Sequence, residues 1–327
     1  MRSGKASIAQ KGRTRDSYRM TVVAACIGAL IAWLVPFTAN APGVVVEILK
    51  HEPPQEAIVL FGGDMMFDRA IRVAADENGD DFLFSCIDET LRDADLVVAN
   101  VEGPITTHDS TSVGSTPGGE NNFTFTFPTS TATLLKRHNI SLVNLGNNHI
   151  MNFSREGLLQ TKKWLDESGV GYFGDPDSPE ADRVARPIIN GIPFSFVNWS
   201  DWTSDKTDHT VQQVRKEAES GRVVVVYTHW GDEYVPPTPR MRQLAHSFVD
   251  ADAAIVIGSH PHIVQEHEVY NGKDIYYSLG NFIFDQYFNE EVRNGLFLKI
   301  IFDKTGVVSI KEIPIYLERD RRTCLKT

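Results

Sequence analysis

Ala253-Ala-Ile-Val-Ile-Gly-Ser-His-Pro-His262 is the segment around which the fold is organised, because an apolar run here leads straight into two histidines. Apolar residues in succession, mostly β-branched, are typical of a strand buried on both faces. His260 precedes a proline, which favours an extended backbone, so His260 and His262 are expected to project toward the same side. Two imidazoles on one side suit a metal ion.

Five other predicted strands along the chain also end in polar residues. The first, Ala57–Phe61, runs into Gly62-Gly63-Asp64, where the glycines are expected to let the backbone turn. Ligands of open α/β sheets bind beyond the carboxyl ends of strands, so these residues are expected to converge in one place. The residues concerned are Asp64, Glu102, Asn148 with His149, His229, His260 with His262, and Asn281.

Strand and helix patterns alternate early in the chain and hairpins crowd the later part, which predicts an α/β fold with mixed sheets. The hairpins are predicted to turn at Asn190-Gly191 and Asn271-Gly272. Residues 106–127 are predicted to be a long surface loop that ends in an edge strand over Phe123–Phe127. Helices are expected near residues 66–75, 82–92, 129–138, 154–168, 209–220 and 240–250.

The N-terminus has the pattern of a membrane insertion signal. Six basic residues and one acidic residue lie within residues 1–19, and residues 21–37 are apolar. We therefore predict a cytoplasmic segment at 1–19, a single-pass signal-anchor transmembrane helix at 20–37, a linker at 38–56 and one extracytoplasmic domain at 57–327. Ala39-Asn40-Ala41 keeps signal-peptide cleavage open as the alternative.

Charge and cysteine content narrow the classes of partner. Residues 1–41 carry a net charge of +5, so the total of −11 leaves −16 for the rest of the chain. Such a surface repels nucleic acid and other polyanions unless a local cation reverses the field, so nucleic acid is not expected as a partner. Cys86 and Cys324 are far apart and show no paired spacing. They are therefore predicted to be packing residues rather than a disulfide framework. Trp199 and Trp202 are likewise interpreted as packing residues.

Imidazoles combined with carboxylates favour Mn²⁺, Zn²⁺ or Fe²⁺, and the predicted site has enough ligands for one or two divalent ions. A carboxylate such as Glu102 can bridge two ions, and hydrolysis then needs no reactive serine or cysteine. Each residue also has a simpler interpretation: Asp64 as a helix cap, Asn148 or Asn281 as a turn residue, His229 as a satisfied strand-end histidine. Together these interpretations require six coincidences at strand ends, which favours a shared site.

Six motifs resemble, in order, those of CapA-type capsule (poly-γ-glutamate) synthesis proteins, and they span about residues 57–285. That family is similar to the calcineurin-like metallophosphoesterases, whose fold is two mixed sheets sandwiched between helices. The motifs are Gly62-Gly-Asp-Met-Met-Phe-Asp-Arg69, Ala99-Asn-Val-Glu-Gly-Pro104, Leu145-Gly-Asn-Asn-His149, Thr228-His-Trp-Gly231, Gly258-Ser-His-Pro-His262 and Tyr277-Ser-Leu-Gly-Asn-Phe282.

The resemblance implies a set of site residues. The metal ligands would be Asp64, Glu102, Asn148, His229, His260 and His262, with His149 as proton donor to the leaving group. Asn281 is predicted at the cofactor site from its place at a strand end. Two positions depart from the superfamily pattern. Met66 stands where a histidine ligand is usual, and Glu102 stands where an aspartate is usual. Arg69 is a candidate for holding a substrate anion.

Three functions are compatible with these features. The first is a membrane-anchored protein of poly-γ-glutamate capsule synthesis or export, which needs membrane subunits because the chain has no Gly-x-x-x-x-Gly-Lys-Ser/Thr phosphate loop. The second is an independent metal-dependent phosphoesterase or amide hydrolase acting on an anionic substrate. The third is a non-catalytic scaffold of a polymer-synthesis complex, a role that Met66 favours.

Overall fold

A computed structural model describes residues 55–179, 183–203 and 207–326. The predicted cytoplasmic segment, the predicted anchor at 20–37 and almost all of the predicted linker lie outside these residues. Among the residues that the model describes, no helix combines the length and apolar character needed to cross a membrane.

The helices and strands follow the sequence pattern closely. The helices are α1 (Arg69–Asn78), α2 (Asp88–Arg92), α3 (Ser130–Arg137), α4 (Ser154–Ser168), α5 (Thr207–Glu219) and α6 (Pro239–Val249). The strands are β1 (Ala57–Met65), β2 (Leu96–Val101), β3 (Ile140–Asn144), β4 (Gly171–Phe173), β5 (Val184–Ala185), β6 (Ile188–Ile189), β7 (Ile192–Ser200), β8 (Val223–His229), β9 (Ile255–Ser259), β10 (His267–Tyr270), β11 (Lys273–Tyr276), β12 (Asn281–Ile283), β13 (Asn294–Asp303), β14 (Gly306–Leu317) and β15 (Thr323–Leu325).

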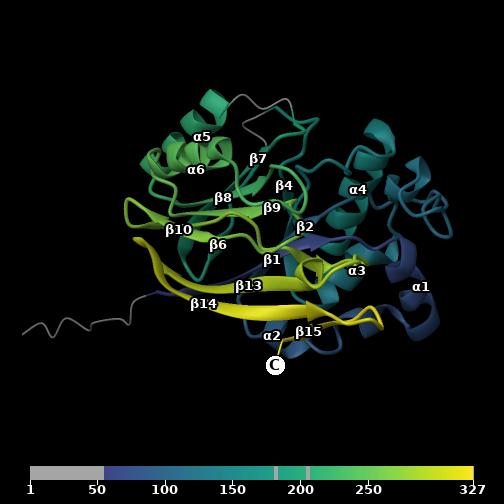
Figure 1. Cartoon of the computed structure of the whole chain (residues 1–327). Helices are drawn as coiled ribbons and strands as arrows, with labels where there is room; N and C mark the ends of the chain where they lie inside the picture. Colours follow the sequence, from purple (N-terminus) through teal and green to yellow (C-terminus); the bar gives the residue numbers. More distant parts are fainter. Residues whose placement is uncertain (1–54, 180–182, 204–206, 327) are drawn as a thin grey trace, which may run out of the picture. The chain divides into compact units, whose positions relative to one another are not determined.

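The strands form two mixed sheets, which confirms the predicted α/β class (Figure 1). An eight-stranded sheet has the order β15-β14-β13-β1-β2-β3-β4, with β12 paired to β1. A seven-stranded sheet has the order β10-β11-β9-β8-β7-β5, with β6 paired to β7. The predicted hairpins at Asn190-Gly191 and Asn271-Gly272 are both present, as antiparallel pairs β6–β7 and β10–β11.

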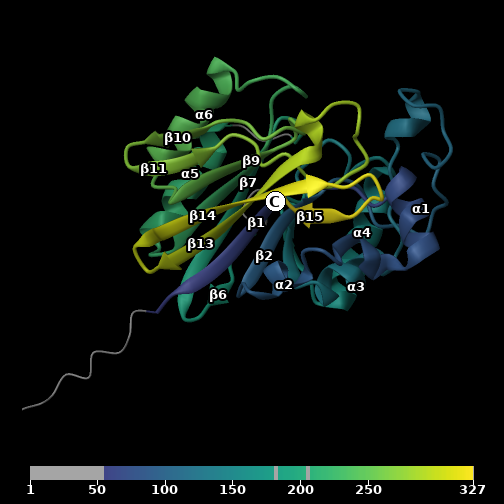
Figure 2. The ribbon, with the colours of Figure 1, turned by 60° about the horizontal axis from the view of Figure 1, so that its bottom comes forward.

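Apolar side chains on both faces of each sheet bury the strands from two sides. Along β8, Val225 and Tyr227 pack against the other sheet, whereas Val224 and Val226 pack against the layer formed by α5 and α6. The eight-stranded sheet has its own helical layer on its outer face, in which Leu134 of α3 belongs to the buried core. This arrangement explains why the central strands read as continuous apolar runs. Figure 2 shows the two sheets from a second direction.

Parallel pairing brings the polar strand ends to a common edge. In the register of the eight-stranded sheet, Asp64 lies opposite Asn100, and Asn100 lies opposite Asn144. In the seven-stranded sheet, His229 lies opposite Ser259. Because β1, β2 and β3 are parallel to one another, as are β8 and β9, each sheet presents a row of polar side chains where its strands end.

The glycines before Asp64 serve close approach rather than a turn, which corrects the prediction from the sequence. Both lie inside β1, and a Cβ at Gly63 would sit 1.8 Å from the carbonyl oxygen of Gly280. That oxygen accepts a hydrogen bond of 3.1 Å from the N–H of Asp64. Glycine at 63 therefore lets β1 continue and fixes Asp64 against the segment that carries Asn281.

Two predicted elements are wrong. The helix expected at 82–92 is a 3-10 turn at Asp80–Phe84 followed by α2, because Cys86 between them pairs with Cys324 in a β-bridge. No edge strand forms over Phe123–Phe127. Phe125 and Phe127 are buried instead, and Phe127 packs edge-on against Phe67 with ring centroids 5.6 Å apart. Phe125 and Phe127 therefore insert into the core, and backbone pairing is limited to a single bridge between Phe127 and Ile105.

The interpretation of the cysteines as packing residues is also wrong, since Cys86 and Cys324 form a disulfide across a separation of 238 residues. The pairing depends on β15, which returns the C-terminal segment to the eight-stranded sheet through β14. Sequence spacing carries no sign of a bond that tertiary structure alone brings about. The disulfide ties the C-terminal strand to the segment between the first 3-10 turn and α2.

A buried carboxylate on α5 supports the packing of this helix on the seven-stranded sheet. Glu217 accepts hydrogen bonds from Arg186 at 2.6 Å and from the hydroxyl of Ser195 at 2.6 Å. Burial acts to raise the pKa of Glu217, but Arg186 and Ser195 outweigh it and hold the pKa below its ordinary value. The carboxylate therefore stabilises the fold in its charged form.

Replacing Glu217 by glutamine is expected to lower the free energy of unfolding at pH 7 by about 2 kcal/mol, because the ion pair is largely buried and Arg186 loses this carboxylate. A group with a depressed pKa stabilises the fold above its unfolded pKa, and this contribution disappears as the pH falls through the folded pKa. The difference between wild type and variant should therefore shrink in acid. Urea unfolding at pH 7 and below pH 4 measures it. Glu219→Gln, on the exposed side of α5, is the matched control, and an equal loss in both variants would contradict the prediction.

Candidate metal centre

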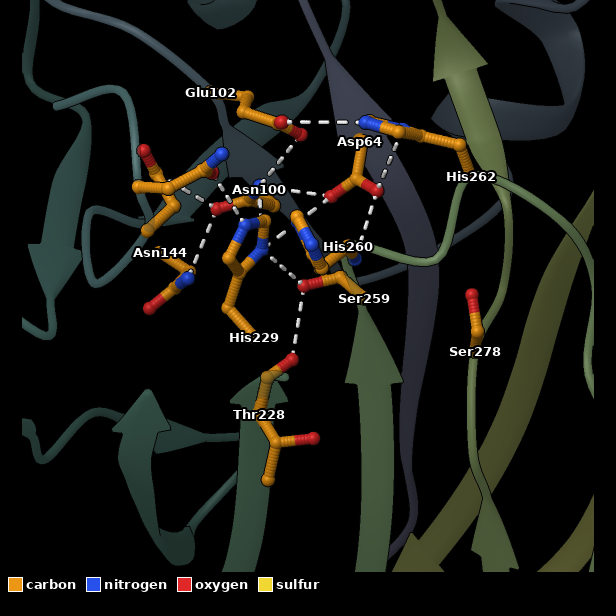
Figure 3. A network of polar contacts seen from close by, with 12 residues as sticks. Asp64, Asn100, Glu102, Asn144, Thr228, His229, Ser259, His260, His262 and Ser278 are labelled. Atoms are coloured by element: carbon orange, nitrogen blue, oxygen red, sulfur yellow. Dashed lines mark hydrogen bonds and ion pairs between the residues drawn. The ribbon is translucent and has the colours of Figure 1, made fainter. Parts of the chain in front are cut away.

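Two buried carboxylates lie at the centre of the converging strand ends. Figure 3 shows Asp64, Glu102, His229, His260 and His262 directed toward one another from both sheets. Asp64 Oδ1 accepts a hydrogen bond of 2.8 Å from the side-chain amide of Asn100, and Asp64 Oδ2 accepts one of 3.0 Å from the N–H of His260. Both carboxylates are completely buried. Buried carboxyl groups of this kind either take up a proton or pair with a cation.

The hydrogen bonds of His262 fix which nitrogen faces Glu102. The Nδ2 atom of Asn281 donates to the carbonyl oxygens of His262 and Val292, so its Oδ1 atom is the acceptor side of the amide. His262 Nδ1 lies 2.9 Å from that Oδ1 and must carry the ring proton. The unprotonated Nε2 then faces Glu102 Oε1 at 3.5 Å. Asn281 thus orients His262 for ligation.

A second set of hydrogen bonds, through Ser259, orients His229. The hydroxyl of Ser259 donates to the carbonyl oxygen of Thr228 at 2.8 Å, so its oxygen accepts the ring proton of His229 Nδ1 at 2.9 Å. The lone pair of His229 is then on Nε2, which lies 2.8 Å from Asn148 Oδ1. With the amide and ring assigned this way, two acceptor atoms face each other. Such a pair is what two ligands of one cation present.

His260 departs from the extended backbone that was predicted for it. Its φ is +96°, and that of His262 is +55°, so both lie in the region that favours glycine. The N–H bond to Asp64 outweighs the preference that Pro261 imposes on His260. The ring nitrogen Nδ1 of His260 is buried without a hydrogen-bond partner. A strained backbone together with a buried ring nitrogen that has no hydrogen-bond partner is typical of a binding site.

Two groups of three ligand atoms share Glu102. Asp64, Glu102 and His262 offer atoms within 4.8 Å of one another, and so do Glu102, His229 and His260. Glu102 belongs to both groups, and its Oε1 atom is buried without a partner. The donor set therefore fits one or two divalent ions, with Glu102 placed between them.

Burial sets the protonation of these groups. It lowers the pKa of His229 and of His262 well below the ordinary value and that of His260 to about 4, so the imidazoles are neutral. Burial raises the pKa of Asp64 to about 6, and burial together with the neighbouring Asp64 raises the pKa of Glu102 well above its ordinary value. Histidine binds a divalent cation through a neutral imidazole, whereas Glu102 must release the proton that burial favours when a cation binds.

His149 and Arg69 lie beside this cluster, and both contact the ring of Phe125. The ring of His149 packs on Phe125 with centroids 4.4 Å apart, and burial lowers its pKa to about 4. The guanidinium of Arg69 lies 5.0 Å from the centroid of the Phe125 ring and donates a hydrogen bond of 2.5 Å to Asp285. Its Nε atom is buried without a partner. Arg69 therefore keeps one donor available.

Met66 does not face the centre as a ligand. Its side chain is buried in the core beneath the helices of the eight-stranded sheet, and its sulfur accepts a hydrogen bond of 3.0 Å from the N–H of Asp68. A thioether is also a weak ligand for hard or borderline cations. The group of Asp64, Glu102 and His262 therefore has no fourth ligand from this position.

Reasoning from the sequence missed several residues that position the centre. Asn100 donates to Asp64, and its own side-chain oxygen accepts from Asn144 at 2.9 Å and from Asn147 at 3.1 Å. Asn100 lies in β2 two residues before Glu102, which follows the strand directly, so the alternation of strand side chains predicts that both point to the same side. Trp202, interpreted as a packing residue, is 44% exposed, and its ring lies 4.2 Å from that of His260.

Comparison with known proteins identifies the family of this chain. The model of the family "Bacterial capsule synthesis protein PGA_cap" matches residues 58–286, which is more than half of the chain. The chain belongs to this family. The matched span contains every residue of the candidate centre, whereas β13 to β15 and Cys324 lie beyond it.

Individual relatives agree with the PGA_cap assignment. The capsule biosynthesis protein CapA of Bacillus anthracis is 27% identical over 300 residues, which cover 85% of this chain and 71% of that relative. The PGA biosynthesis protein CapA of Bacillus subtilis is 28% identical over 275 residues, or 78% of this chain and 70% of the relative. A probable polyglutamine synthesis accessory protein of Mycobacterium tuberculosis is 28% identical over 212 residues, covering 54% of this chain and 56% of the relative.

Proposed function

We propose that this chain is a membrane-anchored, extracytoplasmic protein of poly-γ-glutamate capsule synthesis or export whose metal centre hydrolyses an anionic substrate. The names of the two Bacillus relatives, in capsule and PGA biosynthesis, support the process. The single observation that carries the hydrolytic part is the meeting of Asp64, Glu102, His229, His260 and His262 in two ligand groups that share Glu102.

The proposed roles follow the geometry. Asp64, Glu102 and His262 would hold one ion, and Glu102, Asn148, His229 and His260 a second, in the manner of the calcineurin-like phosphoesterases that the motifs resemble. Divalent ions, with Mn²⁺, Zn²⁺ or Fe²⁺ favoured, supply a water of lowered pKa and neutralise an anionic substrate. The protein holds the ligands in the required tautomers through Asn281 and Ser259.

His149 and Arg69 are the proposed catalytic residues of the chain itself. A pKa of about 4 leaves His149 neutral at pH 7, so donation to a leaving group requires the negative charge of a bound substrate to raise that pKa. Arg69 places the delocalised positive charge of its guanidinium, which is paired with Asp285, near the same anion. A phosphoester or an amide of a γ-linked glutamate chain fits these requirements.

A hollow beside the centre offers room for the substrate. It has a volume of about 330 Å³ and is lined by Asp201, Trp202, Gly231, Asp232, Thr238 and Arg240. Trp202 separates this hollow from His260 and His229, with ring centroids 4.2 and 5.4 Å away. The exposed indole can pack on the carbon chain of a polymer residue.

Two features support the proposed location. The basic residues before the apolar segment 21–37 favour a cytoplasmic N-terminus with the rest of the chain outside. The disulfide between Cys86 and Cys324 is of a kind that persists in oxidising surroundings and is rare in the cytosol. Membrane subunits that make or move the polymer are the proposed partners.

Complementation in a polymer-producing host tests the proposal. Deletion of the gene is expected to change the amount or chain length of the polymer, and Asp64→Asn is expected to fail to restore it. Glu89→Gln, at an exposed position on α2, is the matched control and should restore the polymer fully. An unaltered polymer after deletion rules out the role in the capsule, and full restoration by Asp64→Asn rules out a working metal centre.

A second candidate function is a non-catalytic scaffold, which the core position of Met66 favours because one usual ligand is missing. Elemental analysis of the purified full-length chain distinguishes the two. Stoichiometric Mn, Zn or Fe supports the hydrolase, and absence of transition metal after growth in metal-rich medium supports the scaffold.

A further inference from the structure

The loop after β8 brings an additional carboxylate to the histidine pair. One oxygen of Glu233 and one nitrogen each of His260 and His262 lie within 4.8 Å of one another. Glu233 is exposed, unlike the other residues of the centre. It belongs to neither of the two groups that share Glu102, so it approaches the histidines as a separate ligand.

Backbone contacts hold this loop over the histidines. The N–H of Tyr234 donates to the carbonyl oxygen of Pro261, between the two histidines, at 2.9 Å. Tyr234 has a φ of +63°, a conformation that costs free energy and persists only where the surroundings enforce it. Its hydroxyl accepts a hydrogen bond of 2.8 Å from Gln286, which in turn accepts one of 3.1 Å from Asn281. Glu233 is therefore carried by a segment tied to the same Asn281 that orients His262.

The centre has a place for another ligand. The related superfamily usually has a histidine at the position of Met66. The side chain of Met66 instead packs in the core, and its sulfur accepts a hydrogen bond from the N–H of Asp68. The Nδ1 atom of His260 is buried without a partner. Asp64 and Glu102 offset only half of the charge of two divalent ions, and a third carboxylate brings the centre closer to neutrality.

We propose that Glu233 is a metal ligand that acts together with His260 and His262 and replaces the ligand that Met66 cannot supply. This inference rests on the proposed metal centre and adds a residue to it. A carboxylate on a loop that starts directly after His229 can approach the ion from the solvent side. The ligand set then has three carboxylates, three imidazoles and the side-chain oxygen of Asn148, which favours Mn²⁺ or Zn²⁺ over Mg²⁺.

Calorimetric titration of the full-length chain in detergent, stripped of metal with a chelator, tests the proposal with Mn²⁺ and with Zn²⁺ as probes. Glu233→Gln keeps the shape of the side chain and removes its charge. It is expected to weaken binding of at least one ion about tenfold or more, as loss of a ligand should cost at least as much as loss of a residue that supports one. Stoichiometry after dialysis, measured by elemental analysis, gives a second readout.

Asp232→Asn is the matched control, because Asp232 is an exposed carboxylate on the same loop and loses the same charge. It is expected to change the affinity by less than about twofold, since a general effect of surface charge is screened by salt. Equal affinities of Glu233→Gln and Asp232→Asn would overturn the ligand role of Glu233 and leave the metal centre intact. A wild-type chain that binds neither ion would overturn the proposed centre and this inference together.

Discussion

Glu102→Gln is expected to weaken the binding of both divalent ions by about 100-fold or more and to lower hydrolysis of a generic phosphodiester or a γ-linked glutamyl peptide by about a thousandfold or more. The reason is geometric. Glu102 is the one residue common to the group with Asp64 and His262 and the group with His229 and His260. Glutamine keeps the volume but offers no charge to offset that of the ions. Calorimetry with Mn²⁺ and Zn²⁺ measures the loss of affinity, and initial rates measure the loss of hydrolysis.

In the metal-free protein, Glu102→Gln is expected to increase stability rather than to cause a loss. This increase separates a role of Glu102 in metal binding from a role in stabilising the fold. Two carboxylates buried within 4.8 Å of each other repel in the absence of a cation, so Glu102→Gln is expected to raise the midpoint of thermal unfolding of the stripped protein. Exposed Glu89→Gln should alter neither the affinity nor the midpoint. Wild-type affinity in Glu102→Gln would show that Glu102 does not hold the ions.

The double variant Cys86→Ala with Cys324→Ala is expected to lose about 2 to 5 kcal/mol of unfolding free energy. The disulfide closes a loop with a sequence separation of 238 residues, so its removal frees a large part of the unfolded chain. It also releases β15, a strand of three residues that pairs with β14 and, through Cys324, with Cys86. Urea unfolding of the full-length protein in detergent measures the change.

Reduction provides the matching control. A reductant is expected to lower the stability of the wild type by the same amount and to leave the double variant unchanged, because the variant has no bond to reduce. Equal urea midpoints of the oxidised wild type and the double variant would mean that the bond does not stabilise the fold.

Local sequence was sufficient for the central part of the fold. The run of valines in β8 and the apolar residues before Ser259 could be predicted as buried strands because side-chain hydrophobicity and β-branching act on the residues themselves. The hairpins at Asn190-Gly191 and Asn271-Gly272 followed from the same kind of local preference, since Asn and Gly accept the positive φ that a tight turn needs. Elements that depend on distant partners, such as the Phe123–Phe127 segment, were predicted wrongly.

The candidate centre divides in a similar way. The chemical types of Asp64, Glu102, His229 and His262, and their places at strand ends, could be identified along the chain. Their distances, and the positions of Asn100, Ser259 and Glu233 around them, depend on how two sheets are packed and registered. The backbone conformation of His260 could not be predicted from the local sequence. Its hydrogen bond to Asp64 outweighs the preference for an extended backbone in the residue before a proline.

The sequence by itself determined which segments form the central strands, which residue types stand at their ends and which family the motifs resemble, because these depend on side-chain chemistry and local order. Tertiary structure alone decided the Cys86–Cys324 bond, the tautomers of His229 and His262, and the approach of Glu233. Each of these joins atoms from segments far apart in the chain. Only the packing of the two sheets brings such atoms within bonding distance.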